Sequence, residues 1–236
     1  IPKSLNSSMK KIKPKKVMTL PLPETREGTL SLEAFKKINE FIKKIDILII
    51  GPGLGRDKST QSLVRKVIIK SDKPIVIDAD GLNALVGNLN RLMAHGSWLM
   101  AEKILTPHQG EMARLLGISV GKVQAKRKET SKKVAKDDRV TLVLKGEQTG
   151  VSDYRGNVYG NKTGNPGMAS AGTGDVLTGM ISAFLGQGLS AFDAAKYAVY
   201  SHGLAGDLAA KEKTQISLIA SDIIDKIPEA IKRSLN

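Results

Sequence analysis

The sequence predicts an α/β fold in which a central, mostly parallel sheet carries helices on both faces. Two short runs rich in β-branched residues, Asp46–Gly51 and Lys73–Asp78, are continuously apolar, as strands buried on both faces of a parallel sheet are. Between them, Ser59–Ser71 carries its apolar residues at helical spacing. This strand, helix, strand alternation is the unit from which parallel sheets are built, and it predicts the α/β class.

The rest of the chain continues this pattern. Two further strands are expected at Lys103–Leu105 and Val140–Lys145, and a hairpin at Val151–Asp153 and Val158–Tyr159 around Arg155-Gly156-Asn157. One expected helix ends at Leu116, and a second, on the outside, runs from about Val120 to Lys136. Three more are expected over Asp175–Leu185, Ala191–Ala210 and about Ala220–Arg233. Ser190 and Asp193 have capping-box spacing at the start of the helix expected over Ala191–Ala210.

Length and composition limit the class of protein. A chain of 236 residues without repeats or composition shifts predicts a single domain over residues 1–236. Its apolar runs are strand-sized, far below the roughly 18 residues of a membrane span, and its first residues lack a secretory signal. Cysteine is absent, which excludes disulfides and thiol chemistry. We therefore expect a cytoplasmic protein without a membrane partner.

The net charge of +14 has two interpretations. Lysines cluster in the first sixteen residues, and such a segment can bind nucleic acid electrostatically. That segment holds no aromatic residue for base stacking, however, and basic residues continue along the whole chain. A solvated basic surface that attracts anionic substrates is the better interpretation, and nucleic acid is not the expected partner.

The strongest local motif is a glycine-rich loop, Asn161–Gly172, that enters a helix at Gly172-Thr-Gly-Asp175. Glycines let the backbone approach a ligand closely, and the unpaired N–H groups of a helix start attract an anion. The motif is neither a P-loop nor a dinucleotide fingerprint. A carboxylate is stabilised in any first helical turn, so Asp175 has a purely structural alternative. We expect a nucleotide phosphate here.

Polar turns also follow the predicted strands. They are Gly51–Gly55, Asp78–Asp80 with Asn83, Thr106–His108 with Glu111, and Lys145–Thr149. Each is weak evidence alone, because turns need such residues anyway. Ligands of open parallel sheets bind outside the carboxyl ends of the strands, so the set predicts a site at one sheet edge.

Taken in order from Ile45 to Ile231, these motifs resemble those of the ADP/ATP-dependent NAD(P)H-hydrate dehydratases, a family of the ribokinase-like superfamily. The Gly-Thr-Gly-Asp motif alone would indicate ribokinase-like kinases in general. The segments Thr106-Pro-His-Gln-Gly-Glu111 and Gly51-Pro-Gly-Leu54 narrow the resemblance to the dehydratases. The resemblance implies a ribokinase-like fold and a repair reaction. ADP or ATP phosphorylates the C6 hydroxyl of hydrated NADH or NADPH, and loss of phosphate re-forms the double bond.

The resemblance also implies roles for single residues. Asp175 resembles the catalytic base beside the substrate hydroxyl. Nucleotide contacts are implied for Lys145, Gly146, Glu147, Gln148, Thr149, Gly172, Thr173 and Gly174, the last three through N–H groups on the transferring phosphate. Substrate contacts are implied for Gly51, Gly53, Asn83, His108 and Asp175. Asp80 and Glu111 either help to hold Mg²⁺ or brace their turns, so the metal ligands stay open.

Cofactors and partners follow from the same resemblance. It implies Mg²⁺ with ADP or ATP as co-substrate, an NAD(P)H-hydrate epimerase as functional partner, and a homo-oligomer, a tetramer being one form. One departure is the start at Ile1-Pro-Lys3, which resembles the end of the family's second strand. On this interpretation the N-terminal part of the family domain is missing.

Two other functions remain open at this point. One is a ribokinase-like kinase for a vitamin-precursor alcohol, such as a hydroxymethylpyrimidine or a thiazole alcohol. The other is a nucleotide-binding or basic nucleic-acid-binding module without catalysis. Among the remaining residues, His202 is interpreted as a packing or helix contact, His95 as a surface residue and Trp98 as local packing. No cluster has structural zinc spacing.

Overall fold

The computed structural model describes residues 1–89 and 101–234, which form a six-stranded sheet with helices on both faces. The strands lie in chain order: β1 (Leu48–Ile50), β2 (Ile75–Ile77), β3 (Lys103–Leu105), β4 (Thr141–Leu144), β5 (Gly150–Ser152) and β6 (Val158–Gly160). The strands β1 to β4 pair in parallel, whereas β5 and β6 form the antiparallel hairpin. The predicted mostly parallel sheet and its hairpin are confirmed.

Successive strand residues pack into two separate cores, because side chains alternate between the faces of a strand. In β2, Ile75 and Ile77 join one apolar cluster, whereas Val76 joins the other. In β3, Ile104 and Leu105 divide in the same way. Both faces are therefore covered, which is why these strands are continuously apolar in sequence.

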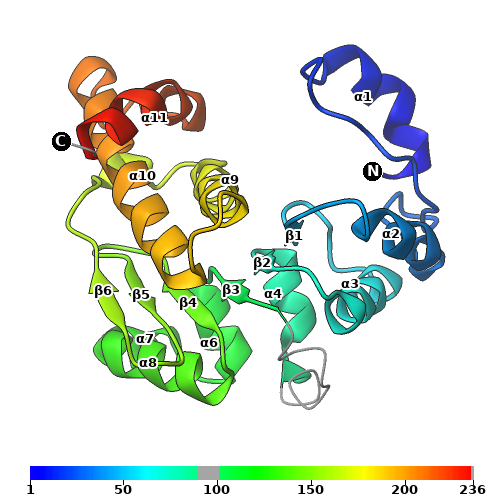
Figure 1. Cartoon of the computed structure of the whole chain (residues 1–236), viewed down its shortest axis with the longest axis horizontal. Helices are drawn as coiled ribbons and strands as arrows, with labels where there is room; N and C mark the ends of the chain where they lie inside the picture. The colour runs from blue at the N-terminus through cyan, green and yellow to red at the C-terminus, as the bar shows by residue number, and fades with distance from the viewer. Residues whose placement is uncertain (90–100, 235–236) are drawn as a thin grey trace.

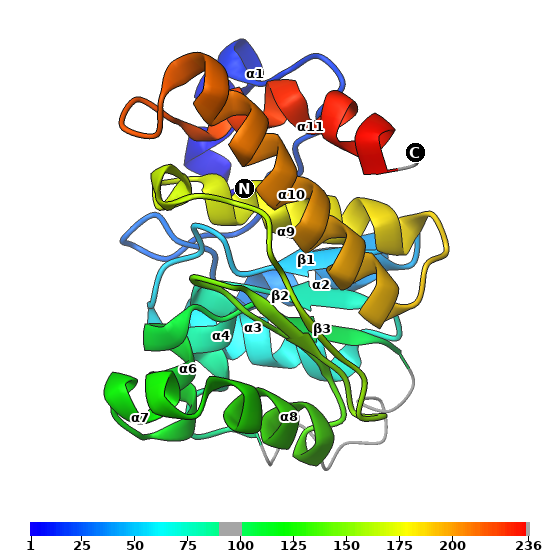
Figure 2. The same ribbon diagram turned by 90° about the vertical axis from the view of Figure 1, so that its left-hand side faces the viewer.

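The first face carries α3 (Lys58–Lys70), α4 (Asp80–Leu85), α6 (Gln109–Leu116), α7 (Val120–Ala125) and α8 (Arg127–Asp137). Figure 2 shows them below the sheet. The predicted apolar stripe of α3 (Leu63, Val64, Val67 and Ile68) is buried to 2% exposure or less. The helix begins behind Asp57, whose carboxylate accepts hydrogen bonds from the N–H groups of Ser59 and Thr60.

The opposite face carries α9 (Thr173–Gly186), α10 (Ala191–Lys213) and α11 (Ala220–Ser234), which lie above the sheet in Figure 2. Ser190 begins α10 as predicted, since its hydroxyl accepts a hydrogen bond from the N–H of Asp193. Among the residues that the structure describes, no helix combines the length and apolar character needed to cross a membrane.

Two parts of the first face differ from the prediction. The single helix expected over Val120–Lys136 is two helices, because Lys126 leaves helical geometry (φ −131°, ψ 38°). The break lets α7 pack on α6 while α8 packs on β4 and β5. The short helix α4, directly after β2, was not predicted.

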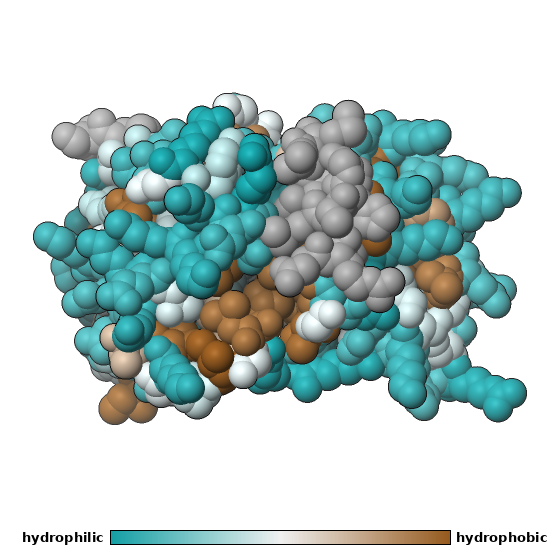
Figure 3. All heavy atoms as spheres, turned by 90° about the horizontal axis from the view of Figure 1, so that it is seen from below, coloured by the Kyte–Doolittle hydropathy of each residue, from teal (hydrophilic) through white to brown (hydrophobic). Residues whose placement is uncertain are grey.

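The segment before β1 contains η1 (Lys3–Leu5), α1 (Asn6–Ile12), η2 (Leu32–Ala34) and α2 (Phe35–Ile42), none of which was predicted. Figure 1 places α1 at the margin of the molecule, and none of its residues is buried. His95 and Trp98 lie outside the described residues, so the interpretations given to them stay predictions. Seen from below, most of the surface is hydrophilic, with apolar side chains gathered in one area (Figure 3).

Candidate functional site

The turns after β1 and β2 touch each other at the carboxyl edge of the sheet. Gly51 has φ +131°, and a Cβ at this position would lie 1.7 Å from the carbonyl oxygen of Asp78. Only glycine therefore fits here, for both steric and conformational reasons. The predicted convergence of these two turns is confirmed by the contact.

A strained residue separates the two acids of the β2 turn. Ala79 has φ 48° and ψ −118°, which is unfavourable for a residue with a Cβ. Asp80 accepts hydrogen bonds from the Gly55 N–H (2.9 Å) and from Asn83 Nδ2 (3.0 Å). Asp80 thus braces the turns after β1 and β2, which was one of its two interpretations. The Asn83 side-chain oxygen accepts from Arg114 Nε at 3.3 Å, and a substrate role for Asn83 stays a prediction.

His108 and Glu111 form a capping box at the start of α6. His108 Nδ1 accepts hydrogen bonds from the N–H groups of Gly110 (3.0 Å) and Glu111 (3.3 Å). Glu111 Oε2 accepts in return from the His108 N–H at 2.8 Å. Glu111 therefore braces its turn, while the His108 side chain remains 54% exposed beside it. Exposure leaves the ring accessible to a ligand, although substrate contact stays a prediction.

A buried ion pair links the ends of β2 and β4 to α9. Lys145 Nζ donates to Asp78 Oδ1 at 2.7 Å and lies 4.0 Å from Glu111 Oε2. Asp78 is 2% exposed, and its second oxygen accepts from the Thr178 hydroxyl at 2.9 Å. A Cβ at Gly174 would lie 3.5 Å from Lys145 Nζ, so the ammonium lies beside the first turn of α9.

The sequence motifs place Asp78 and Lys145 in turns at this edge but do not pair them, and they do not include Thr178, whose hydroxyl donates to Asp78. The available signal was the spacing of Gly174 and Thr178, which are four residues apart and so share one face of a helix. Thr178 is thus a polar side chain on the same helix face as the glycine-rich turn, and this could have marked it as part of the site.

The predicted nucleotide segment after β4 is a tight turn. Gly146 has φ +141°, and Gln148 adopts a left-handed conformation at φ 53°. The Thr149 hydroxyl donates to the Gly146 carbonyl at 3.0 Å, which closes the turn. Glu147 and Gln148 are exposed at its tip. Burial lowers the pKa of the neighbouring Arg127 guanidinium, and the nearby charge of Glu147 opposes that shift.

The start of α9 is open toward solvent. Gly172 has the left-handed backbone (φ 85°) that turns the loop into the helix, and no side chain caps the helix. The N–H groups of Gly174 and Asp175 donate to no backbone acceptor among the described residues. The Asp175 side chain is exposed and makes no hydrogen bond or ion pair within the same residues. Free donors and a free carboxylate thus lie side by side.

The glycine-rich loop before α9 lies directly on α10. Asp207 accepts hydrogen bonds from the Gly164 N–H (2.8 Å) and from Asn165 Nδ2 (3.0 Å). Thr163 donates to the carbonyl of Tyr200 at 2.8 Å. A Cβ at Gly203 would lie 2.3 Å from Thr163 Oγ1, so α10 needs glycine at this contact. The loop is therefore held against α10 by side chains of both segments and is also braced by hydrogen bonds of its own.

His202 lies beneath this loop, as the packing interpretation expects. It is 8% exposed, and burial lowers its pKa to about 4 against the opposing effect of a hydrogen bond with the Thr173 backbone. The imidazole is therefore neutral at physiological pH.

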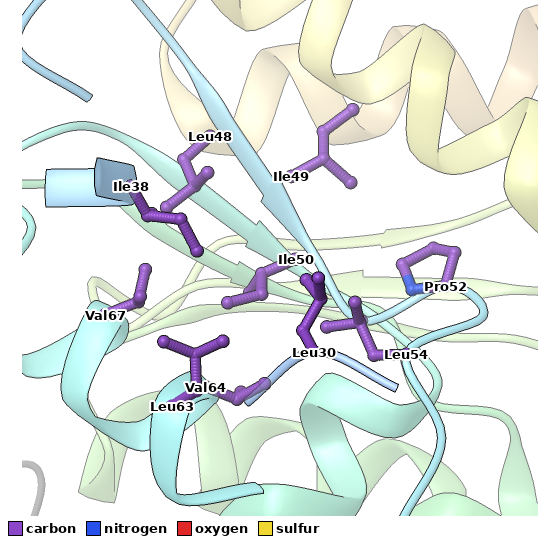
Figure 4. A pocket seen from close by; sticks show the side chains of 11 residues that line it. Leu30, Ile38, Leu48, Ile49, Ile50, Pro52, Leu54, Leu63, Val64 and Val67 are labelled. Carbon is purple, nitrogen blue, oxygen red and sulfur yellow. The ribbon is translucent and has the colours of Figure 1, made fainter. Parts of the chain in front are cut away.

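An apolar cavity of about 300 Å³ lies beside β1 and reaches Gly51, the turn residue that touches Asp78. Figure 4 shows side chains from β1, α3 and the preceding segments around it. Its lining residues are Leu30, Ile38, Leu48, Ile49, Ile50, Gly51, Pro52, Leu54, Leu63, Val64 and Val67. Gly51 is the one predicted site residue in this lining. None of these lining side chains carries a charge or a hydrogen-bond donor for a phosphate group.

The donor set at the edge suits a metal ion that arrives with a nucleotide. Within residues 1–89 and 101–234, no group of three or more His, Asp or Glu side chains could hold a metal ion by itself. Mg²⁺ usually takes only one or two carboxylates together with substrate phosphates. Glu111 could provide one such carboxylate, because only its Oε2 accepts a hydrogen bond within the described residues, whereas both oxygens of Asp78 are occupied.

Comparison with known proteins identifies similar chains. A family model described as NAD(P)H-hydrate dehydratase matches residues 6–229. The chain is 44% identical over 222 residues to the bifunctional NAD(P)H-hydrate repair enzyme Nnr of Moorella thermoacetica, covering 94% of this chain and 41% of that protein. It is 39% identical over 183 residues to the ADP-dependent (S)-NAD(P)H-hydrate dehydratase of Neisseria meningitidis, covering 76% of this chain and 60% of that protein. The chain thus spans about two fifths of the length of the Nnr relative.

Solved structures agree with these relatives. The ADP/ATP-dependent NAD(P)H-hydrate dehydratase of Bacillus subtilis, co-crystallized with ATP and Mg²⁺, is 36% identical with a TM-score of 0.71. That match covers 80% of this chain and 64% of the other. A ribokinase-like superfamily protein of Enterococcus faecalis is 27% identical with a TM-score of 0.72, covering 86% and 68%. The predicted ribokinase-like fold is confirmed.

Proposed function

The chain belongs to the NAD(P)H-hydrate dehydratase family, and from this premise we propose that it restores hydrated NADH or NADPH to the reduced cofactor, using ADP or ATP. The hydrate carries an extra hydroxyl at C6, and hydroxide is a poor leaving group. Phosphorylation converts it into a phosphate ester. Loss of phosphate from C6, with a proton from the adjoining carbon, then re-forms the double bond.

One observation carries the proposal: the open start of α9. Its free N–H groups at Gly174 and Asp175, the adjacent Lys145 ammonium and the free Asp175 carboxylate lie together. Phosphoryl transfer needs a base for the attacking hydroxyl and positive charge around the transferring group. These residues supply both requirements within one turn of helix.

We assign the following roles. Asp175 accepts the proton of the C6 hydroxyl as the oxygen attacks phosphorus. The N–H groups of Gly172, Gly174 and Asp175 and the Lys145 ammonium hold the transferring phosphate, whereas the N–H of Thr173 donates to the Ser170 carbonyl at 3.4 Å. The exposed turn Gly146–Thr149 meets the nucleotide, while Gly51, Gly53, Asn83 and His108 face the hydrated nicotinamide. Mg²⁺, held by nucleotide phosphates with Glu111, would neutralise phosphate charge.

The test is an assay of the purified chain with hydrated NADH or NADPH, Mg²⁺, and either ADP or ATP. We expect the near-ultraviolet absorbance of the reduced nicotinamide to return, with one inorganic phosphate released for each cofactor recovered. Omitting the nucleotide or adding a chelator should abolish the signal, and excess Mg²⁺ should restore it. Full turnover in chelator would contradict the metal assignment.

The same assay separates the alternatives. A vitamin-precursor kinase would accumulate a stable phosphomonoester of its alcohol and would leave the hydrate unchanged. A binding module without catalysis would bind ADP or ATP and release no phosphate. Either result would overturn the dehydratase proposal.

Partners and assembly are also proposals. Relatives named as bifunctional NAD(P)H-hydrate repair enzymes support a functional partnership with an NAD(P)H-hydrate epimerase. We further propose a cytoplasmic homo-oligomer, with a tetramer as one form. Light scattering coupled to size-exclusion chromatography measures its mass in solution, and a monomer at assay concentration would contradict the assembly.

A further inference from the structure

Asp78 is the most buried charged group at the carboxyl edge, and the proposed reaction gives it no role of its own in the transfer of phosphate. It is 2% exposed, and both of its oxygens are occupied by side chains from distant parts of the chain. Lys145, 67 positions away, donates to Oδ1, and Thr178, 100 positions away, donates to Oδ2. One carboxylate therefore ties together the ends of β2 and β4 and the second turn of α9.

Stability alone is a weak reason for this arrangement. Desolvation of two charges offsets much of their attraction, and replacement by apolar residues is often neutral or stabilising. A buried carboxylate beside a partly exposed ammonium instead fixes the position of the ammonium. Lys145 keeps 18% of its side chain exposed, and its Nζ lies beside Gly174, where the free N–H groups begin.

We propose that Asp78, assisted by Thr178, is a positioning residue that holds the Lys145 ammonium against the first turn of α9, where it meets the transferring phosphate. The inference rests on the proposed function, because it assumes that phosphate binds at this turn. A lysine side chain is a flexible four-carbon stem, so its ammonium can point in many directions. With Oδ1 of Asp78 as an anchor at 2.7 Å, the ammonium is restricted to one place before the nucleotide arrives.

The test is a double-mutant cycle with Asp78→Asn and Lys145→Met. Lys145→Met should lower kcat about 100-fold, as loss of one charge-stabilising donor does. Asp78→Asn should lower kcat roughly 10- to 100-fold, because it misplaces that donor. If Asp78 acts through Lys145, the double variant should be no worse than Lys145→Met within about twofold.

Matched variants separate positioning from folding. Asp137→Asn removes an exposed Lys–Asp pair of similar length (2.8 Å, with Lys133) and should leave kcat unchanged. Thr178→Val keeps the shape of the side chain and should lower kcat about fivefold, the equivalent of one hydrogen bond. If Asp78→Asn does not fold, the cycle of Thr178→Val with Lys145→Met replaces it. Thermal unfolding of every variant accompanies the kinetics.

Three results would overturn the inference: unchanged kcat in Asp78→Asn, losses that multiply in the double variant, or independent effects of Thr178→Val and Lys145→Met. The same cycle is read in parallel on ADP affinity by titration calorimetry. If the wild-type chain binds ADP but does not repair hydrated NADH, the proposed function fails while coupling in ADP affinity still supports the positioning role. Additive losses of ADP affinity would overturn that role as well.

Discussion

Four carboxylates at the carboxyl edge differ in how many partners they have. Asp80 accepts hydrogen bonds from Gly55 and Asn83, and Glu111 accepts one from His108. Asp78 is occupied by Lys145 and Thr178. Asp175 has no partner among the described residues. A base must be able to accept a proton from a ligand, so the unoccupied carboxylate is the best candidate.

Asp175→Asn tests this at a single residue. The amide keeps the size of the side chain but cannot act as a base, so turnover should fall about 100-fold or more, within the usual range for general bases. ADP affinity and thermal stability should change little. The matched control is Asp193→Asn, which alters an acid in the first turn of α10. It should cost only about 0.3–1 kcal/mol of stability. Near-normal turnover of Asp175→Asn would end its assignment as the base.

His202 gives a prediction about pH. Burial lowers its pKa to about 4 from an ordinary value of 6.5, so between these values the unfolded chain binds a proton that the folded chain does not. The free energy of unfolding is therefore highest above pH 6.5, and it decreases by about 3 kcal/mol in total as the pH falls toward 4.

The measurement is the free energy of unfolding in urea for the wild type and His202→Gln over that pH range. At neutral pH the variant should be the less stable protein, since it loses the packing of the imidazole. Its deficit should shrink as the pH falls, because glutamine does not titrate. A deficit that stays constant with pH would show that His202 is not buried in the neutral form.

At the scale of elements, the strands and most helices could be predicted because each carries its own pattern. The stripe of Leu63, Val64, Val67 and Ile68 specifies a helix face by itself, and the turn Arg155-Gly156-Asn157 specifies a hairpin. The break at Lys126 could not be predicted, since neither glycine nor proline marks it. It arises because α7 and α8 pack on different neighbours, which is information from the tertiary structure.

In the site too, features with a local sequence pattern could be predicted, and features that depend on tertiary contacts could not. Gly51, His108 and the Gly172–Asp175 turn could be placed at one edge because each directly follows a strand or begins a helix. The link from Asp78 to Lys145 and Thr178 could not, because it joins residues 67 and 100 positions apart and no local pattern records that distance. The strained Ala79 was equally invisible, since its conformation is imposed by the contact between the turns.

The contact between α10 and the glycine-rich loop can be tested as an element. Gly203→Ala would place a Cβ 2.3 Å from Thr163 Oγ1 and 2.7 Å from the Thr163 backbone, so the loop must move. We expect a loss of about 1–3 kcal/mol of stability, as for an overpacked core. ADP affinity should weaken too, because the loop leads into the turn proposed to bind phosphate.

Gly179→Ala is the matched control for that prediction. Gly179 lies within α9, and a Cβ there would meet nothing within 4 Å. Alanine should stabilise the helix by about 0.5–1 kcal/mol. Thermal unfolding and ADP titration of both variants give the comparison. Equal stabilisation by the two substitutions would show that the loop does not lie on α10 as described.

At the scale of the whole molecule, the net charge of +14 acts on both proposed substrates, since nucleotides and hydrated cofactors are anions. A positive field raises the rate at which anions reach the site, and salt screens that field over distances beyond about 10 Å at 0.1 M. The charge therefore predicts an effect on encounter rather than on the chemical step.

We expect kcat/KM for ADP or ATP to fall several-fold between about 0.02 and about 0.5 M salt, while kcat stays nearly constant. The assay compares sodium chloride with sucrose at matched viscosity, at saturating Mg²⁺, so that slower diffusion and metal loss are excluded.

A variant with Lys10, Lys11 and Lys13 changed to glutamine removes three charges from the exposed N-terminal segment. Its salt dependence should be slightly weaker than that of the wild type, because most of the charge remains. A kcat/KM that does not change with salt would show that the basic surface does not attract substrate. A fall in kcat itself would instead place the salt effect on the ion pair of Lys145 and Asp78.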